Sequence, residues 1–207
     1  MAYGSFRTKL PKLDFKEEFR PVIIAGKETQ DYFISNYGNV QSMIANSPGF
    51  LKWGYSTVGK NSRVHGLKID VHLDPDFFIG THLEKHIFRK KGSKYKITLS
   101  CHKAVMNAFR PFHENLPDEI QKIVDDDIAA GIPKERTNTW LDYIYNHCIT
   151  INHIDHNPEH NYIHPTKKHE QDNLEWCSVY ENNLKAIEYR KTNVREDDFD
   201  ENYILDI

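Results

Sequence analysis

The sequence has few cysteines, no long apolar run and no strong excess of one charge. Its three cysteines, Cys101, Cys148 and Cys177, lie far apart and form no C-x-x-C pair. This pattern disfavours a disulfide framework and a cysteine-rich zinc knuckle, and it predicts buried or unreactive thiols. No stretch reaches the roughly 18 apolar residues of a membrane helix, and residues 1–15 lack the apolar core of a secretory signal. We therefore expect a cytoplasmic protein without a membrane segment.

The charge of the chain is unevenly distributed. The 207 residues are 39% hydrophobic and 12% aromatic, enough for one or two modest cores, and the formal net charge is -3. Residues 196–207 hold six acids and no base, and we expect this acidic tail to be disordered. Residues 52–103 hold 11 Lys or Arg against 4 Asp or Glu, a net of +7. Such a local basic patch would attract a polyanion. The alternative is a lysine-rich hairpin that is merely solvated, which would have the same composition.

The first half of the chain has the pattern of short strands. Period-two alternation around "DYFISNYGNVQSM" predicts a β-hairpin with Tyr32, Ile34 and Val40 on the apolar face and a turn at residues 36–39. Farther on, Gly and Pro punctuate short apolar runs, which predicts more short strands with basic residues along their edges. Residues 1–100 are therefore expected to form a small β-rich region.

The middle of the chain changes to a helical period. In "CHKAVMNAFRPF" the apolar residues recur at helical spacing, and Pro111 should end the helix. Residues 117–130 and 138–147 also have helical patterns, the first with Pro and acids in its opening turn. These two segments make a helical insertion over about residues 113–148.

The last part of the chain predicts two strands and a helix. We expect strands at 149–154 and about 173–177, separated by a long polar loop, and a helix at 179–190. Ser178 and Glu181 have the spacing of a capping box at the start of that helix. The two strands and the helix should pack together as a ββα unit.

Three motifs resemble a known family of nucleases. "INHIDHN" and "DNLEWCSVYEN" resemble the HNH motif, in the subgroup of phage and intron-encoded homing endonucleases. "CHKAVMNAF" resembles the helix that precedes the motif there, and "YFISNYGNVQS" resembles the N-terminal DNA-binding module often fused to such nucleases. The three matches follow the order of the family and cover about a third of the chain.

The resemblance implies a fold, an activity and roles for four residues. The fold would be α+β, with the DNA-binding region at 1–100 and a ββα-metal (His-Me finger) nuclease core at 101–195. His153 would be the general base, Asn152 and Asn182 would hold a divalent metal, Mg²⁺ or Mn²⁺, and Asn173 would pin the loop between the two strands. The partner would be double-stranded DNA, and a monomer is favoured over a homodimer. A phage-encoded enzyme would act in the cytoplasm of its bacterial host.

The chemistry of phosphodiester hydrolysis suits these residue types. The reaction needs a base that titrates near neutrality and a hard cation that stabilises the leaving oxygen. Adjacent residues of a strand point to opposite faces, so Asn152 and His153 share a side only where the strand is distorted or ends. Two amide oxygens hold Mg²⁺ weakly, so the scissile phosphate must complete the coordination shell of the metal. Asn183 is the alternative candidate for the metal ligand assigned to Asn182.

Basic side chains predict where DNA would lie. The expected contact surface is a cluster of lysines and one arginine before the helix predicted in "CHKAVMNAFRPF": Lys85, Arg89, Lys90, Lys91, Lys94 and Lys96. His102 and Lys103, at the start of that helix, would contact phosphate, and the alternative is a solvated helix end.

Other readings of the same residues remain. Five histidines and one cysteine could supply the ligands of a zinc site: His147, Cys148, His156, His160, His164 and His169. Structural zinc is disfavoured, because the cysteines of the chain are unpaired and prolines interrupt the helical spacing of the histidines. The family usually has glycine where this chain has His156, and its loop is about eight residues shorter. The alternative functions are a catalytically weak or inactive sequence-specific DNA-binding protein and a dimeric restriction-type HNH nuclease.

Overall fold

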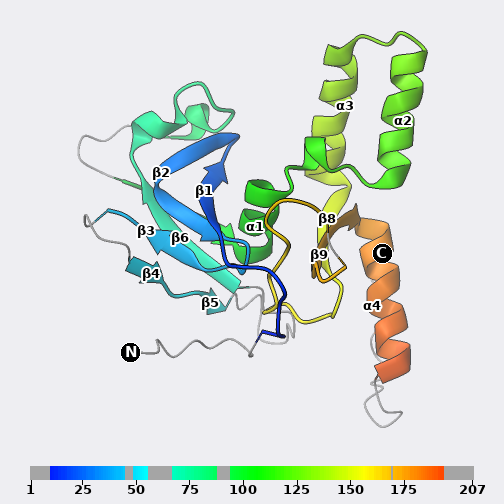
Figure 1. Ribbon diagram of the computed structural model, residues 1–207. Coiled ribbons are helices and arrows are strands. Elements are labelled where there is room, and N and C mark those ends of the chain that lie inside the picture. Colours follow the sequence, from blue (N-terminus) through cyan, green and yellow to red (C-terminus); the bar gives the residue numbers. More distant parts are fainter. Residues whose placement is uncertain (1–9, 45–48, 56–66, 88–93, 169, 194–207) are drawn as a thin grey trace, which may run out of the picture.

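The computed structural model describes residues 10–44, 49–55, 67–87, 94–168 and 170–193. These residues form a mixed α+β structure with four α-helices and three small antiparallel sheets. The sheets lie on two sides of a central helix, and a pair of helices projects from the body (Figure 1). The expected α+β class is therefore confirmed.

The first half of the chain forms two sheets, as its period-two pattern predicts. The first has the order β1-β2-β3-β4 and the second has the order β5-β6-β7. The tight turn between β2 and β3 is the predicted one, and Gly38 adopts a φ of +75° there, which glycine tolerates best. The strands are β1 (Phe19–Ile24), β2 (Lys27–Ser35), β3 (Val40–Ser42), β4 (Gly49–Leu51), β5 (Gly54–Tyr55), β6 (Leu67–Leu73) and β7 (Tyr95–Ser100). Two single-turn 3₁₀ helices, η1 (Pro75–Phe78) and η2 (Glu84–His86), follow β6.

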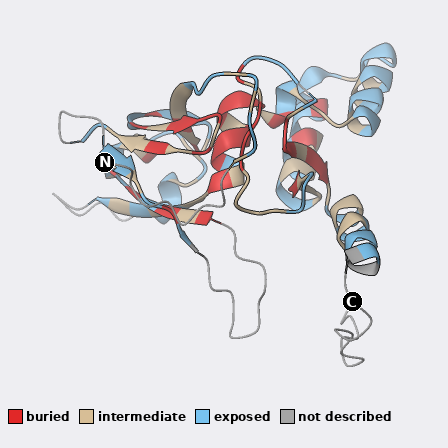
Figure 2. Cartoon of the chain, turned by 60° about the horizontal axis from the view of Figure 1, so that its bottom comes forward, coloured by how far each residue is buried: buried red, intermediate tan, exposed pale blue. Residues whose placement is uncertain are grey.

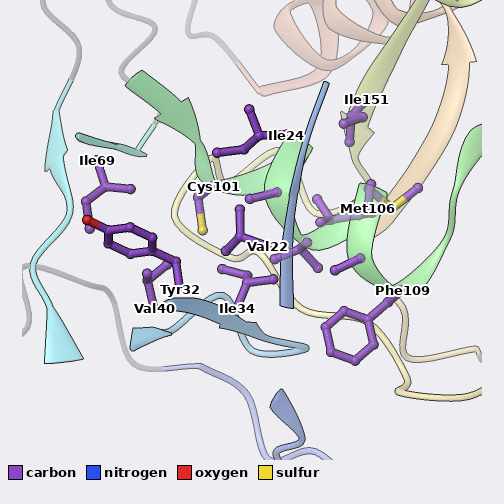
Figure 3. Close-up of a cluster of buried hydrophobic side chains, with 14 of the residues drawn as sticks. Val22, Ile24, Tyr32, Ile34, Val40, Ile69, Cys101, Met106, Phe109 and Ile151 are labelled. Atoms are coloured by element: carbon purple, nitrogen blue, oxygen red, sulfur yellow. The ribbon is translucent and has the colours of Figure 1, made fainter. Parts of the chain in front are cut away.

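The helix α1 (Cys101–Phe109) occupies the centre of the core. Six of its nine residues are buried, and it contacts β1, β2, β6, β7 and β9. Figure 3 shows Val22, Ile34 and Met106 among the side chains that fill this cluster, and the buried segments gather around α1 in Figure 2. The helix ends at Phe109 because Pro111 disfavours a helical conformation at the residue before it. The core is continuous from the N-terminal sheets to the last hairpin.

The insertion consists of a 3₁₀ turn and two helices that project from the body. They are η3 (Phe112–Glu114), α2 (Asp118–Ala129) and α3 (Lys134–His147). The helix α3 starts four residues before the predicted 138, directly after Pro133, which suits a helix start. Among the α2 residues none is buried, whereas Thr137 and Leu141 of α3 are buried and Leu141 belongs to the core. Figures 1 and 2 show the exposed hairpin that these two helices form.

The last elements are β8 (Ile149–His153), β9 (Leu174–Ser178) and α4 (Val179–Asn193). The two strands pair antiparallel, and α4 contacts both of them, so the expected strand–strand–helix arrangement is present. The capping box is also confirmed. The Glu181 amide donates to Ser178 Oγ at 3.0 Å, and the Ser178 amide donates to Glu181 Oε2 at 2.9 Å.

Two further expectations concern membranes and thiols. In the described part of the chain no helix is both long and apolar enough to cross a membrane. Cys101 and Cys177 are buried, Cys148 is half-buried, and all three are free thiols. Trp176, Leu174 and Phe109 are buried in the core.

Candidate active site at the end of β8

His153 is the last residue of β8, and its side chain turns toward α1. It pairs with Leu174 across the hairpin, and the loop begins at the next residue. Its Nε2 lies 3.1 Å from Asn161 Oδ1. Its ring meets that of His102 edge to face, with 5.5 Å between the ring centroids. The structure thus brings two histidines and a buried asparagine together at the end of the strand.

The two histidines are held in their neutral form. Burial lowers the pKa of His153 from its ordinary 6.5, although hydrogen bonding to Asn161 and the charge of Asp155 oppose this. Burial, followed by the charges of His153, Lys103 and Lys68, lowers the pKa of His102 to about 4. At pH 7 both imidazoles are neutral, so His153 has a lone pair with which to accept a proton.

Asn152 lies on the opposite side of β8 and has a different set of partners. It is buried, and its Nδ2 donates to Glu175 Oε1 at 2.7 Å. Lys185 of α4 donates to the same carboxylate oxygen at 2.6 Å. Burial by itself would raise the pKa of Glu175, but hydrogen bonds from Lys185 and Asn152 outweigh it and lower that pKa. Asn152 and His153 therefore follow the ordinary alternation of a strand, and β8 ends immediately after them.

The hydrogen bond to Glu175 fixes which end of the Asn152 amide faces that carboxylate. Because a carboxylate only accepts hydrogen bonds, the Nδ2 end of Asn152 must face Glu175, and the Oδ1 end points elsewhere. Asn182 is half-buried in the first turn of α4, the helix that contacts β8. Its neighbour Asn183 is exposed. Within the described ranges no three His, Cys, Asp or Glu side chains group around a metal position.

Asn173 fastens the loop that joins the two strands. It is 2% exposed, and its Oδ1 accepts a hydrogen bond from the Asp155 amide at 2.9 Å. Its Nδ2 donates to Asp155 Oδ1 at 2.9 Å and to the His160 carbonyl at 2.6 Å. These three bonds bind both ends of the segment that carries Asp155 and His160, directly after the candidate base.

Asp155 and His156 complete the start of the loop. Burial alone would raise the pKa of Asp155, but hydrogen bonds from His160, the Asn157 amide and Asn173 outweigh it and lower the pKa. His156 takes a φ of +57°, a left-handed conformation that favours glycine. Its ring stacks on Tyr189 of α4, with centroids 4.1 Å apart. This contact gives the histidine a packing partner in a conformation that is costly for a side chain.

The turn between β2 and β3 packs against the same loop. Asn36 is fully buried, and its backbone carbonyl accepts from the Ile163 amide at 2.9 Å while its Nδ2 donates to the Ile163 carbonyl at 3.1 Å. A Cβ added to Gly38 would lie 3.0 Å from the Asn161 carbonyl oxygen and 2.8 Å from Cys101 Sγ. The N-terminal turn therefore supports the loop that carries Asn161.

The residues predicted to contact DNA fall into separate places. Lys85 is exposed on η2, and Lys94 and Lys96 are exposed at β7, where Lys96 pairs with Asp70 at 3.2 Å. Lys103 is exposed in the first turn of α1, with its ammonium 5.2 Å from the centre of the Tyr145 ring. His102 is half-buried against His153. Three predicted residues, Arg89, Lys90 and Lys91, lie outside the described residues.

Sequence reasoning missed three residues of this site. Asn161 contacts His153, Glu175 contacts Asn152, and Lys68 of β6 adds positive charge beside His102. Glu175 lies on a predicted strand, directly opposite Asn152 once the two strands are paired in register. Asn161 had no such signal, because its position depends on the path of an irregular loop.

No family model, curated protein or solved structure matches this chain.

Proposed function

We propose that this chain is a metal-dependent DNA endonuclease of the HNH type. One observation carries the proposal. His153 is a neutral, half-buried imidazole at the end of β8, with one ring nitrogen bonded to Asn161. It directly follows an asparagine whose carbonyl oxygen is turned away from its carboxylate partner. A base and a metal ligand in this order are what the resemblance to the HNH motif implies.

The proposed reaction is hydrolysis of a DNA phosphodiester bond. His153 takes a proton from a water molecule, and the water oxygen forms a bond to phosphorus. The bond from phosphorus to the 3′ oxygen breaks, and that oxygen takes a proton from solvent water, leaving a 5′-phosphate and a 3′-hydroxyl. A divalent cation held by Asn152, Asn182 and a phosphate oxygen would stabilise the negative charge on the leaving oxygen. Because the two proposed protein ligands are neutral amide oxygens, we expect metal binding to strengthen when DNA is present.

The surface around His102 supports an approach of the phosphate backbone from the side of α1. Burial is the main cause of the low pKa of His102, and the charges of Lys103 and Lys68 contribute to it, so two cationic side chains lie near this histidine. In this proposal the N-terminal sheets position the duplex and the last hairpin with α4 cuts it. A phage homing endonuclease that acts as a monomer in the cytoplasm of the infected bacterium is the setting that the resemblance favours.

The decisive test is cleavage of supercoiled plasmid and of source-genome DNA at low salt. Wild type, His153→Ala and the control His113→Ala should be compared in Mg²⁺, in Mn²⁺ and in EDTA. His113 is an exposed histidine on η3, so its replacement controls for the preparation and for the loss of an imidazole. We expect metal-dependent nicking or linearisation by wild type and by His113→Ala, and a loss of about 10²-fold or more in His153→Ala.

The other outcomes have distinct meanings. Equal activity in His153→Ala and wild type would contradict the role of His153 and indicate a contaminating nuclease. DNA binding without cutting by any variant would favour the binding-only alternative. If light scattering shows that the protein is a dimer when bound to DNA, and if it cleaves at a palindromic sequence, the restriction-type alternative is favoured.

The metal ligands can be tested with neighbouring asparagines. Asn182 is half-buried and Asn183 is exposed, so Asn182→Ala and Asn183→Ala make a matched pair on one helix. We expect Asn182→Ala to require a higher Mg²⁺ concentration for half-maximal cleavage and Asn183→Ala to behave as wild type. The reverse result would transfer the ligand role to Asn183.

A further inference from the structure

The most informative contact of the site is between His153 and Asn161. Asn161 is fully buried, lies eight residues after His153, and is not among the residues that the HNH resemblance assigns a role. Its Oδ1 is 3.1 Å from His153 Nε2, and its Nδ2 donates to the Pro158 carbonyl at 2.9 Å. The side chain therefore uses both ends of its amide within the loop.

The Pro158 contact fixes which end of the amide faces the histidine. A backbone carbonyl can only accept hydrogen bonds, so the NH₂ group of Asn161 must point at Pro158. Its carbonyl oxygen must then point at His153 Nε2. Because that oxygen can only accept, Nε2 must carry the hydrogen. In a neutral imidazole the other nitrogen, Nδ1, then has no hydrogen and is the one that can accept a proton.

Asn161 is held in place by a distant part of the chain. The turn at Gly38 lies against its carbonyl, and the Ile163 amide donates to the Asn36 carbonyl at 2.9 Å. The Gly38 carbonyl is in turn held by Trp53 Nε1 at 2.7 Å. An amide that is fully buried and supported on its backbone has little freedom to rotate, so the orientation of its oxygen is preset.

From this geometry we infer that Asn161 is a positioning residue. It fixes His153 in the tautomer with hydrogen on Nε2, so that Nδ1 is the nitrogen that takes the proton from water. This assignment rests on the proposed nuclease function for its catalytic meaning. When Nδ1 accepts the proton, Nε2 keeps its hydrogen and its bond to Asn161, so the ring does not have to move during the step.

The tautomer can be measured directly on the full chain without DNA or metal. Uniformly ¹⁵N-labelled wild type at about pH 8, where histidine is neutral, should be studied by long-range ¹H–¹⁵N correlation NMR. The chain has 12 histidines, and the His153 signals are identified by their loss in His153→Ala. We expect a protonated Nε2 and an unprotonated Nδ1. A protonated Nδ1 in wild type would overturn the inference, and this measurement needs no variant at position 161 to fold.

Variants then test whether Asn161 is the cause. Asn161→Ala removes the acceptor, and we expect the two tautomers of His153 to become mixed. Asn161→Asp retains an acceptor oxygen and should retain hydrogen on Nε2. The control is Asn157→Ala, the same truncation in the same loop, since the side chain of Asn157 bonds to His160 and the Glu159 amide. An unchanged His153 spectrum in a folded Asn161→Ala protein would overturn the inference.

Cleavage kinetics supply the second readout. We expect kcat of Asn161→Ala to fall by about 10- to 100-fold with a much smaller change in KM, and Asn161→Asp to recover part of the loss. A rise in KM at unchanged kcat would overturn the positioning role. The expected tautomer in a protein that cuts no DNA would contradict the proposed function and leave the hydrogen bond assignment standing, so the two failures are distinguishable.

Discussion

Replacing Asn173 by alanine should destabilise the protein strongly, although the change removes only a small polar side chain. The side chain makes three hydrogen bonds, two with Asp155 and one with the His160 carbonyl, at 2.6 to 2.9 Å. A typical intramolecular hydrogen bond contributes about 1 kcal/mol, and one to a charged group about 1.5 to 3 kcal/mol. The Asp155 carboxylate accepts one of the three. We therefore expect Asn173→Ala to lower the free energy of unfolding by about 3 to 5 kcal/mol.

Urea denaturation followed by circular dichroism measures this change. Asn146→Ala is the matched control, because Asn146 is exposed on α3 and its side chain makes one bond to the Asp142 carbonyl of the preceding turn. We expect the control to stay within about 0.5 kcal/mol of wild type. A loss of less than about 1 kcal/mol in Asn173→Ala would refute the reasoning, because the loop would then not depend on the Asn173 amide.

The isosteric variant Asn173→Asp adds a test with a definite pH dependence. It places a second carboxylate where an NH₂ group now meets Asp155. Two adjacent carboxylates raise the pKa of one of them in the folded state above its unfolded value, so stability decreases as the pH rises. Asn173→Asp should therefore be destabilised more at pH 7 than at about pH 5. The opposite trend would show that the two side chains do not meet.

Three further predictions use other parts of the molecule. Gly38→Ala should lower the free energy of unfolding by about 2 to 4 kcal/mol, measured by urea denaturation, because alanine disfavours a φ of +75° and its Cβ would overlap Cys101 Sγ. Phe78→Ala should cost about 3 to 5 kcal/mol in the same assay, since Phe78 is fully buried, whereas Ile128→Ser on the exposed hairpin should change stability by less than about 0.5 kcal/mol. The cleavage rate should be constant above neutral pH and should fall in acid as His153 becomes protonated, because burial lowers the pKa of His153 below its ordinary 6.5. A pH–rate profile in which the acidic loss of activity has its midpoint above pH 6.5 would contradict this.

The local elements of this protein were predictable from the sequence because their causes are local. The turn at Gly38, the end of α1 before Pro111, and the capping box of Ser178 and Glu181 each depend on residues a few positions apart. The order of two strands and a helix at the end of the chain followed from the same kind of pattern. The start of α3 differed, because Pro133 favoured a helix start before the apolar pattern became visible. The helix α4 also continues to Asn193, past the predicted 190.

The candidate site was predictable where it lies on regular structure. Asn152 and His153 alternate across β8 as strand residues must, and the strand ends where the sequence changes to a polar loop. The role of Asn182 comes only from the resemblance. The metal, the substrate and the reaction come only from the resemblance to HNH nucleases, and they remain proposals.

The sequence alone determined the approximate positions of the α-helices and of the last two strands, the apolar faces and the order of the candidate catalytic residues, because these depend on neighbours along the chain. The tertiary structure decided which side chains meet across 8 residues of loop, as for His153 and Asn161, or across a strand pair, as for Asn152 and Glu175. It also brought the Gly38 turn against the Asn161 loop, more than a hundred residues away. Such contacts depend on loop paths and on packing around α1, which no local pattern encodes.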